Sequence, residues 1–169
     1  MELELRPLDA RSFDGFAQEM QEAFQLAIED APEEKAPPVL PRKDIDASLA
    51  HPNAQALEAI CKGERVGGAV LFLNEETMEH ECALLYVKKD SHSKGVGTAL
   101  WKAIEKRYPE TVAWKLCTPY FEVRNINFYL KKCGFRIVDL FEEMHKESGY
   151  ADKRDLMFSF VKRLDGKWS

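Results

Sequence analysis

A glycine-punctuated turn joins a strand-like segment to a helix-like segment between Val87 and Leu100. Backbone N–H groups in the first turn of a helix lack intrahelical acceptors and lie at the positive end of the helix dipole, so they can bind a phosphate without a cationic side chain. Gly95 and Gly97 leave room for an anion to approach the backbone. The following residues form an apolar stripe that would pack on a sheet: Ala99, Leu100, Ala103 and Ile104. The run therefore predicts a site for a phosphate or pyrophosphate group.

The spacing of this turn excludes two familiar nucleotide motifs. The sequence contains no G-x-x-x-x-G-K-[ST]. The dinucleotide fingerprint requires a third Gly or Ala at the position of Leu100, and a tighter turn than the eight positions from Val87 to Gly95. A nucleotide-binding α/β protein remains an alternative, and it predicts protection by ATP or NAD.

The turn instead resembles motif A of the GNAT superfamily of N-acyltransferases, V-x-x-x-x-[RQ]-x-x-G-x-[GA]-x-x-L, which binds the pyrophosphate of acetyl-CoA. Val87, Gly95, Gly97 and Leu100 match that motif, whereas His92 stands where the family usually has Arg or Gln. The resemblance implies that acetyl-CoA is the cosubstrate. It assigns the pyrophosphate to the turn made by His92, Ser93, Lys94, Gly95, Val96, Gly97 and Thr98.

A second segment, from Arg124 to Phe135, resembles motif B of the same family. In that motif an Asn that contacts the cofactor opens a helix, an aromatic-Tyr pair follows, and Gly-Phe ends the helix. Here Tyr129 lies five residues before Gly134, where the family usually has four, and Asn125 is nearer the Tyr than is typical. We expect the extra residue in the turn around Cys133 and Gly134, because a glycine cap absorbs an insertion more readily than a helix does. The alternative is that Tyr129 is an ordinary core aromatic.

The resemblance also implies the route of the cofactor. In the family, two parallel strands splay apart near the glycine turn and admit the pantetheine arm. We expect main-chain groups of Leu85 and Val87 to pair with the pantetheine amides as an added strand would. Plain burial in the core is the other interpretation of both residues.

Acyl transfer to an amine by direct attack in a ternary complex needs a base, because a lysine-like amine is almost wholly protonated at neutral pH. Glu81 lies six residues before Val87, where histone-type members of the family carry their catalytic Glu. Strand alternation places Glu81 on the same face as Ala83, Leu85 and Val87.

The remaining catalytic candidates follow from the same resemblance. Glu79 shares the face of Glu81 and is the substitute base, acting through a water. An exposed position near the start of the strand is the alternative interpretation of Glu81. Tyr129 would protonate the departing CoA thiolate, since a phenol with a pKa of about 10 readily donates to such a leaving group.

Length and composition favour one enzyme domain over residues 1–169. The chain has 45% apolar residues and a formal net charge of −5, with no basic stripe, which argues against nucleic acid as a partner. No apolar run approaches the ~20 residues that span a bilayer, so no membrane association is expected. The cysteines Cys61, Cys82, Cys117 and Cys133 form no C-x-x-C pair, which predicts reduced thiols in a cytoplasmic protein and no metal site.

Hydrophobic periodicity predicts an α/β (α+β) fold, a mixed, mainly antiparallel central sheet with helices on both faces. The predicted strands are 2–6, 56–61, 65–73, 80–88, 111–117, 135–141 and 156–164. The predicted helices are 9–28, 44–50, the helix after the glycine turn, and 124–132, with a proline-rich linker around 32–41. A right-handed crossover through the helix after the turn makes the strands on either side of it parallel neighbours.

The acceptor is not specified beyond an amine carried by a small molecule or a peptide. Acidic residues in the first helix and linker, namely Glu19, Glu22, Glu29, Asp30, Glu33 and Glu34, would attract a cationic amine, but a solvated helix face explains them equally. The resemblance allows a homodimer through the last strands, although no residue specifies one. A non-catalytic module that binds or senses acyl-CoA is the alternative to an enzyme.

Overall fold

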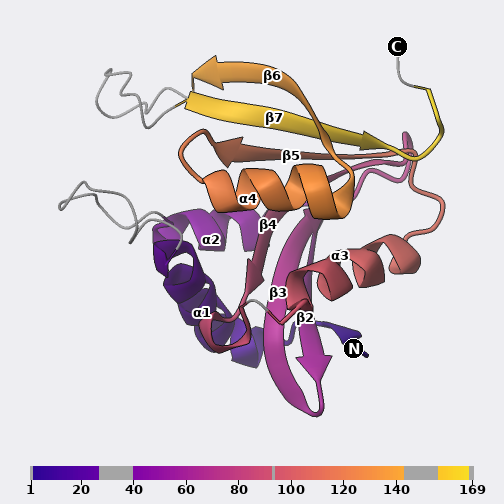
Figure 1. The fold of residues 1–169 in the computed structure, drawn as a ribbon. Helices are drawn as coiled ribbons and strands as arrows, with labels where there is room; N and C mark the ends of the chain where they lie inside the picture. Colours follow the sequence, from indigo (N-terminus) through magenta and orange to yellow (C-terminus); the bar gives the residue numbers. More distant parts are fainter. Residues whose placement is uncertain (1, 27–39, 93, 143–155, 168–169) are drawn as a thin grey trace.

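A computed structural model describes residues 2–26, 40–92, 94–142 and 156–167. Within these residues, strands form a sheet in the order β1-β2-β3-β4-β5-β7-β6 (Figure 1). The strands are β1 (Glu4–Pro7), β2 (Ala54–Cys61), β3 (Glu64–Phe72), β4 (Glu79–Val87), β5 (Ala113–Pro119), β6 (Arg136–Glu142) and β7 (Leu156–Arg163). Of the neighbouring pairs in this sheet, β4 and β5 are parallel and the others are antiparallel. The predicted mixed, mainly antiparallel sheet is confirmed.

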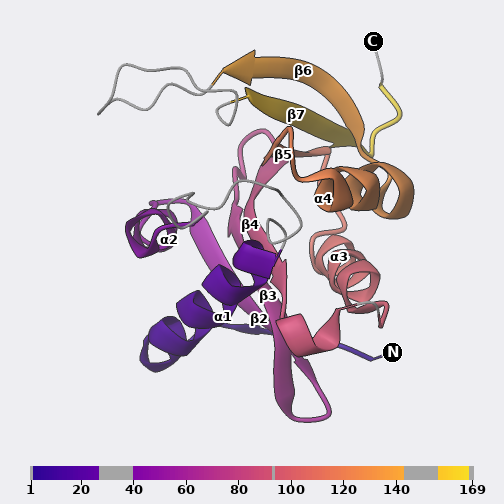
Figure 2. The ribbon, with the colours of Figure 1, turned by 60° about the vertical axis from the view of Figure 1, so that its left-hand side comes forward.

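The helices cover both faces of the sheet, as predicted (Figure 2). They are α1 (Phe13–Leu26), α2 (Arg42–Leu49), α3 (Val96–Arg107) and α4 (Val123–Asn127), which continues as a π-helix over Phe128–Cys133. We call the side covered by α1 and α2 the α1 face, and the side covered by α3 and the π-helix the α3 face. The predicted residues 27 and 28 of the first helix and most of the proline-rich linker lie outside the described residues.

Each face has its own apolar core. On the α3 face, Trp101 and Ile104 of α3 pack with Trp114 of β5 and Phe160 of β7, all of them essentially inaccessible to solvent. The core of the α1 face is made by Phe16, Ala17, Met20, Ala23, Ile45, Val70 and Tyr86. The two cores hold the sheet between two helical layers and fix the ends of β4 and β5 relative to α3.

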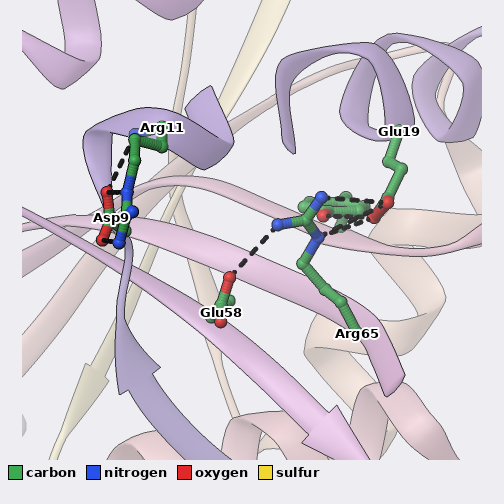
Figure 3. Close-up of polar contacts among 6 residues, drawn as sticks. Asp9, Arg11, Glu19, Glu58 and Arg65 are labelled. Atoms are coloured by element: carbon green, nitrogen blue, oxygen red, sulfur yellow. Dashed lines mark hydrogen bonds and ion pairs between the residues drawn. The ribbon is translucent and has the colours of Figure 1, made fainter. Parts of the chain in front are cut away.

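A polar network holds α1 on the sheet within the second core (Figure 3). Arg65 of β3 donates to Glu19 of α1 through Nε at 2.9 Å and through Nη2 at 3.2 Å, and to Glu58 of β2 through Nη1 at 3.1 Å. The hydroxyl of Tyr86 in β4 also donates to Glu19, at 3.1 Å. Glu19, predicted as part of an acidic rim, is therefore engaged in a structural ion pair.

A β-bulge at Ala83 interrupts the alternation of β4. Phe72 pairs with Glu81 and Leu71 with Cys82, but the next residue of β3, Val70, pairs with Leu84. Because one extra residue is inserted in β4, the side chains after it change faces. Cys82 and Leu85 both pack in the core of the α3 face, although they lie three residues apart. The prediction that Glu81 shares a face with Ala83, Leu85 and Val87 is wrong for this reason.

Candidate active site

The parallel strands β4 and β5 separate after a short paired segment. The residues that pair between the two strands are Glu79 with Ala113, His80 with Trp114 and Glu81 with Lys115. Beyond Glu81 the bulge redirects β4, while β5 continues to pair with β7 on its other side as far as Pro119. We call this opening between the two strands the splay; it is the gap that the family resemblance predicts.

The backbone of β4 turns hydrogen-bonding groups toward the splay, and one of them, the Val87 carbonyl, already has a partner in the turn. Lys88 donates its N–H to the carbonyl of Val66 in β3, at 2.8 Å. In an antiparallel pair, alternate residues bond to the same neighbour, so the N–H and C=O groups of Leu85 and Val87 point away from β3 and into the splay. Nε2 of His92 lies 2.7 Å from the carbonyl oxygen of Val87, and it donates to that oxygen. His92 thereby ties the glycine turn back to the end of β4.

The glycine turn presents the unpaired N-terminal end of α3. Gly95 has a φ of 77°, in the left-handed region, and a Cβ at this position would meet no atom within 4 Å. The first intrahelical bond runs from the Ala99 N–H to the Gly95 carbonyl, at 3.1 Å. The amides before it belong to Val96, Gly97 and Thr98, which fits the predicted anion site. Lys94 is exposed beside these amides, and Ser93 lies outside the described residues.

Three segments meet at Gly97. A Cβ at this position would lie 3.2 Å from the Phe128 ring and 3.5 Å from Cγ2 of Val87. Gly97 is therefore needed for close packing between the start of α3, the end of β4 and the start of the π-helix. The helix after β5 reaches the glycine turn through this contact, and sequence reasoning did not assign this role to Phe128.

The π-helix absorbs the extra residue of the second motif. The N–H groups of Gly134 and Phe135 both bond to the carbonyl of Tyr129, five and six residues earlier. The expectation that the insertion lies in the turn around Cys133 and Gly134 is wrong, because the wider π-turn accommodates it inside the helix. Gly134 nonetheless forms the left-handed cap that was expected, with a φ of 83°.

Tyr129 is buried on the inner side of this helix. Its ring packs against Phe135 and Phe160, with centroids 5.7 Å and 5.8 Å away. Burial raises the pKa of its phenol well above the ordinary value, and Cys82, Cys133 and Glu122 raise it further. In the described part of the chain no hydrogen bond involves its hydroxyl.

Glu122 is a buried carboxylate that sequence reasoning missed. It lies three residues after the end of β5, at the residue before α4, and is 4% exposed. Asn125 donates Nδ2 to its Oε2, at 2.9 Å. Burial raises the pKa of Glu122, while the bond from Asn125 lowers it. The available signal was a single acidic residue flanked by Phe121 and Val123, which is an apolar setting.

A hollow of about 250 Å³ opens on the α1 face beside the last paired residues of β4 and β5. Its lining comprises His51, Asn53, Phe72, Leu73, Asn74, Glu79, Glu81 and Lys115. The His51 ring stacks on Phe72, with a centroid distance of 4.0 Å and an interplanar angle of 15°. The hollow therefore combines two carboxylates with an aromatic wall at the mouth of the splay.

Glu79 and Glu81 both line this hollow, in agreement with the prediction that they share a face, but their surroundings differ. Glu79 lies 4.0 Å from Nζ of Lys115 and 3.8 Å from Nη1 of Arg163. Glu81 has no ion pair among the described residues and is half-buried. His80, between them, is buried against Trp114 and Tyr108 on the other face. Of the two carboxylates, only Glu79 lies within 4.0 Å of a cationic side chain in the part of the chain that the structure describes.

The profile of the Acetyltransferase (GNAT) family matches residues 17–135, about two thirds of the chain, including β4, the glycine turn and the helix after β5. This chain belongs to the GNAT acetyltransferase family. It is 40% identical over 163 residues to the uncharacterized protein YrkN of Bacillus subtilis (strain 168), covering 90% of this chain and 88% of that protein. Acyl transfer is the chemistry of the family.

Solved acetyltransferases share the fold at low sequence identity. The PaiA N-acetyltransferase of Thermoplasma acidophilum, in complex with coenzyme A, superimposes with a TM-score of 0.71 at 17% identity, covering 96% of this chain and 99% of that chain. The ribosomal-protein-S18-alanine N-acetyltransferase of Escherichia coli gives 0.70 at 12% identity, covering 99% and 97%. At these identities the likeness concerns the fold alone.

Two further findings concern membrane-spanning helices and metal ligands. No described helix is both long and apolar enough to cross a lipid bilayer. Among residues 2–26, 40–92, 94–142 and 156–167, no three His, Cys, Asp or Glu side chains gather as a metal site would require. The groups placed around the splay are instead backbone amides, carboxylates and a phenol.

Proposed function

We propose that this protein is an acetyl-CoA-dependent N-acetyltransferase that transfers the acetyl group directly to a primary amine. The observation that supports this most strongly is the arrangement around the splay. The free amides of α3 and the buried phenol of Tyr129 belong to the α3 face, the backbone groups of Leu85 and Val87 point into the opening, and the half-buried carboxylate of Glu81 belongs to the α1 face.

In this proposal the amides of Val96, Gly97 and Thr98 bind the pyrophosphate, and Leu85 and Val87 bind the pantetheine amides through their main chains. Asn125, on the helix after β5, is proposed to contact the cofactor from the side opposite β4. The acetyl group is thereby held where β4 and β5 part, so that its carbonyl carbon is open toward the hollow on the α1 face.

The amine occupies the hollow, where Glu81 accepts its proton directly or through a water. The nitrogen then forms a bond to the carbonyl carbon while the carbon–sulfur bond breaks, and it gives up a second proton to water as the amide forms; the proton on Glu81 also passes to water. Tyr129 donates its phenolic proton to the departing thiolate, and solvent restores that proton. Proton removal and proton delivery are thus assigned to opposite faces of the sheet.

The first test is a thermal-shift titration with acetyl-CoA, CoA, ATP and NAD. A ligand at 100 times its dissociation constant adds about 2.7 kcal/mol to the free energy of unfolding. We expect stabilisation by the two CoA species and none by ATP or NAD. A shift with NAD or ATP but not with CoA would overturn the assignment of the glycine turn.

The second test measures free-thiol release from acetyl-CoA across a panel of amines. The panel contains polyamines, amino acids and peptides with free N-termini. Turnover with any of them, at a rate above hydrolysis without amine, supports N-acetyl transfer. Stabilisation by CoA without turnover on any amine class would favour an acyl-CoA-binding module instead.

A further inference from the structure

We propose that Glu122 is a positioning residue for the binding of coenzyme A. Its buried carboxylate holds the carboxamide of Asn125 so that the amide oxygen faces the splay. The proposal rests on the acetyl-CoA site described above. It assigns a role to the one carboxylate among the described residues that is nine-tenths or more buried.

Glu122 lies at the side of the splay formed by β5 and the helix that follows it. It comes three residues after Pro119, the end of β5, and its own carbonyl accepts the first bond of that helix, from the Ile126 N–H at 3.0 Å. Its carboxylate is close enough to Tyr129 to influence it electrostatically, and Tyr129 packs with Cys82, next to the bulge of β4. The carboxylate is thus placed between the helix and the splayed strands.

The side chain of Glu122 does not cap the helix, although Glu122 occupies the capping position. Its hydrogen bond comes from the side chain of Asn125 instead, at 2.9 Å. Because the amide nitrogen of Asn125 donates to Glu122, the amide oxygen points away from Glu122. This hydrogen bond therefore sets the orientation of the carboxamide.

This orientation matters for a ligand in the splay. The pantetheine arm carries two secondary amides, whose N–H groups need acceptors once they leave water. An Asn125 free to rotate would offer either its NH₂ or its oxygen, and half of its orientations would place a donor against a donor. Fixing the oxygen outward removes that cost before the ligand binds.

A double-mutant cycle on CoA binding tests the proposal. We expect Asn125→Ala to weaken CoA binding about fivefold to tenfold, the effect of one lost hydrogen bond. We expect Glu122→Ala to weaken it by a similar factor, roughly threefold to tenfold, but to have little further effect in the Asn125→Ala background. The measurements are CoA titrations by calorimetry on the full chain, with the melting temperature of each variant recorded.

Matched variants separate positioning from general damage. Glu105→Gln removes another half-buried carboxylate, which is paired with Lys162 at 3.0 Å on the outer part of α3, and should leave CoA affinity unchanged. Glu122→Gln keeps the shape and one acceptor, and should bind CoA more tightly than Glu122→Ala. This partial rescue would not occur if the carboxylate had no role in orienting Asn125.

The outcomes distinguish the two proposals. If wild-type protein does not bind CoA, the proposed function fails and the positioning role, which rests on it, fails with it. If wild-type protein binds CoA but the effects of Glu122→Ala and Asn125→Ala add fully, the positioning role is overturned while the acetyltransferase assignment stands. An unchanged affinity in Glu122→Ala, with a native melting temperature, overturns it as well.

Discussion

Glu81 and Leu85 lie four residues apart on one strand and face opposite sides of the sheet. Phe72, the partner of Glu81, packs in the core of the α1 face, whereas Leu85 packs in the core of the α3 face. The bulge at Ala83 produces this change, and parallel pairing with β5 ends at Glu81, just before the bulge. One inserted residue thus separates the carboxylate from the strand segment assigned to the cofactor, and it lies where the splay begins.

Because Glu81 lies on the face opposite the cofactor segment, its substitution should affect the chemical step and not cofactor binding. Glu81→Gln should lower kcat on the order of a hundredfold, which is typical for loss of a general base. The KM for acetyl-CoA should hardly change, because Glu81 faces away from the cofactor side. Steady-state kinetics at saturating amine give both values.

Glu79→Gln is the matched control for this prediction. Glu79 lies near Lys115 and Arg163, so its removal should change kcat less than threefold and the free energy of unfolding by about 0.5 kcal/mol. A larger loss of kcat in Glu79→Gln than in Glu81→Gln would move the base to Glu79. Full activity in both variants would remove carboxylate base catalysis from the mechanism.

Tyr129→Phe should lower kcat by about tenfold to a hundredfold with little change in stability near neutral pH. The stability should hold because the hydroxyl has no hydrogen bond within the described residues. Burial keeps the pKa of Tyr129 well above the ordinary value, so the wild-type pH–rate profile should show no decline near pH 10 from loss of this proton. A basic limb that disappears in Tyr129→Phe would contradict that expectation.

The raised pKa of Tyr129 also predicts how the free energy of unfolding depends on pH. Burial also raises the pKa of Tyr86, so both phenols hold their protons more tightly in the folded chain than in the unfolded chain. Their contribution to the stability of the folded chain is fully present below a pH of about 10, the pKa of tyrosine in the unfolded chain, and is lost as the pH rises above that value. Urea unfolding at pH 8 and pH 11 should show that Tyr129→Phe loses less stability over this interval than wild type.

The local sequence pattern was sufficient to predict the order of helices and strands and the position of the glycine turn. Alternating and helical periodicity are properties of short segments, and a positive-φ glycine before a helix is a local requirement as well. The matches at Val87, Gly95, Gly97 and Leu100 therefore led to the family that the profile identifies.

Two features could not be predicted, because each depends on a partner distant in the chain. The bulge at Ala83 exists only in the register between β4 and β3, and Ala83 itself carries no signal of it. The π-helix depends on how Tyr129 packs against Phe160 and Phe135, which the spacing to Gly134 alone does not reveal. Glu122 was missed because burial of a carboxylate is a tertiary property.

Gly97→Ala should weaken CoA binding through Phe128. The new Cβ would lie 3.2 Å from that ring, so the ring must move away from the start of α3. We expect CoA affinity to fall about tenfold, and Gly97→Ala/Phe128→Leu to recover part of it, since the smaller side chain relieves the contact. Calorimetric CoA titrations compare the two variants.

Gly95→Ala is the contrasting variant at the same turn. Its Cβ would meet nothing, but its backbone has a φ of 77°, so the cost is backbone strain of about 1–2 kcal/mol. The melting temperature should fall, and Phe128→Leu should give no rescue. If Phe128→Leu rescues both glycine variants equally, the contact at Gly97 is not the cause of the weaker binding.

The network around Arg65 predicts a stability effect without a catalytic one. The side chains of Arg65, Glu19 and Glu58 are 18%, 16% and 17% exposed, so Arg65→Ala leaves two mostly buried carboxylates without their cation. We expect a loss of about 3 kcal/mol in the free energy of unfolding, measured by urea denaturation. CoA affinity should remain within about twofold of wild type wherever the variant is folded.

Two comparisons identify the cause of that loss. Arg11→Ala removes an ion pair with Asp9 whose side chains are 90% and 53% exposed, and should cost less than about 0.5 kcal/mol (Figure 3). Arg65→Met/Glu19→Gln/Glu58→Gln removes the whole network and should be more stable than Arg65→Ala, because no buried charge is left uncompensated. If the triple variant is less stable than Arg65→Ala, packing of the Arg65 side chain on Phe16, rather than charge, holds α1 against the sheet.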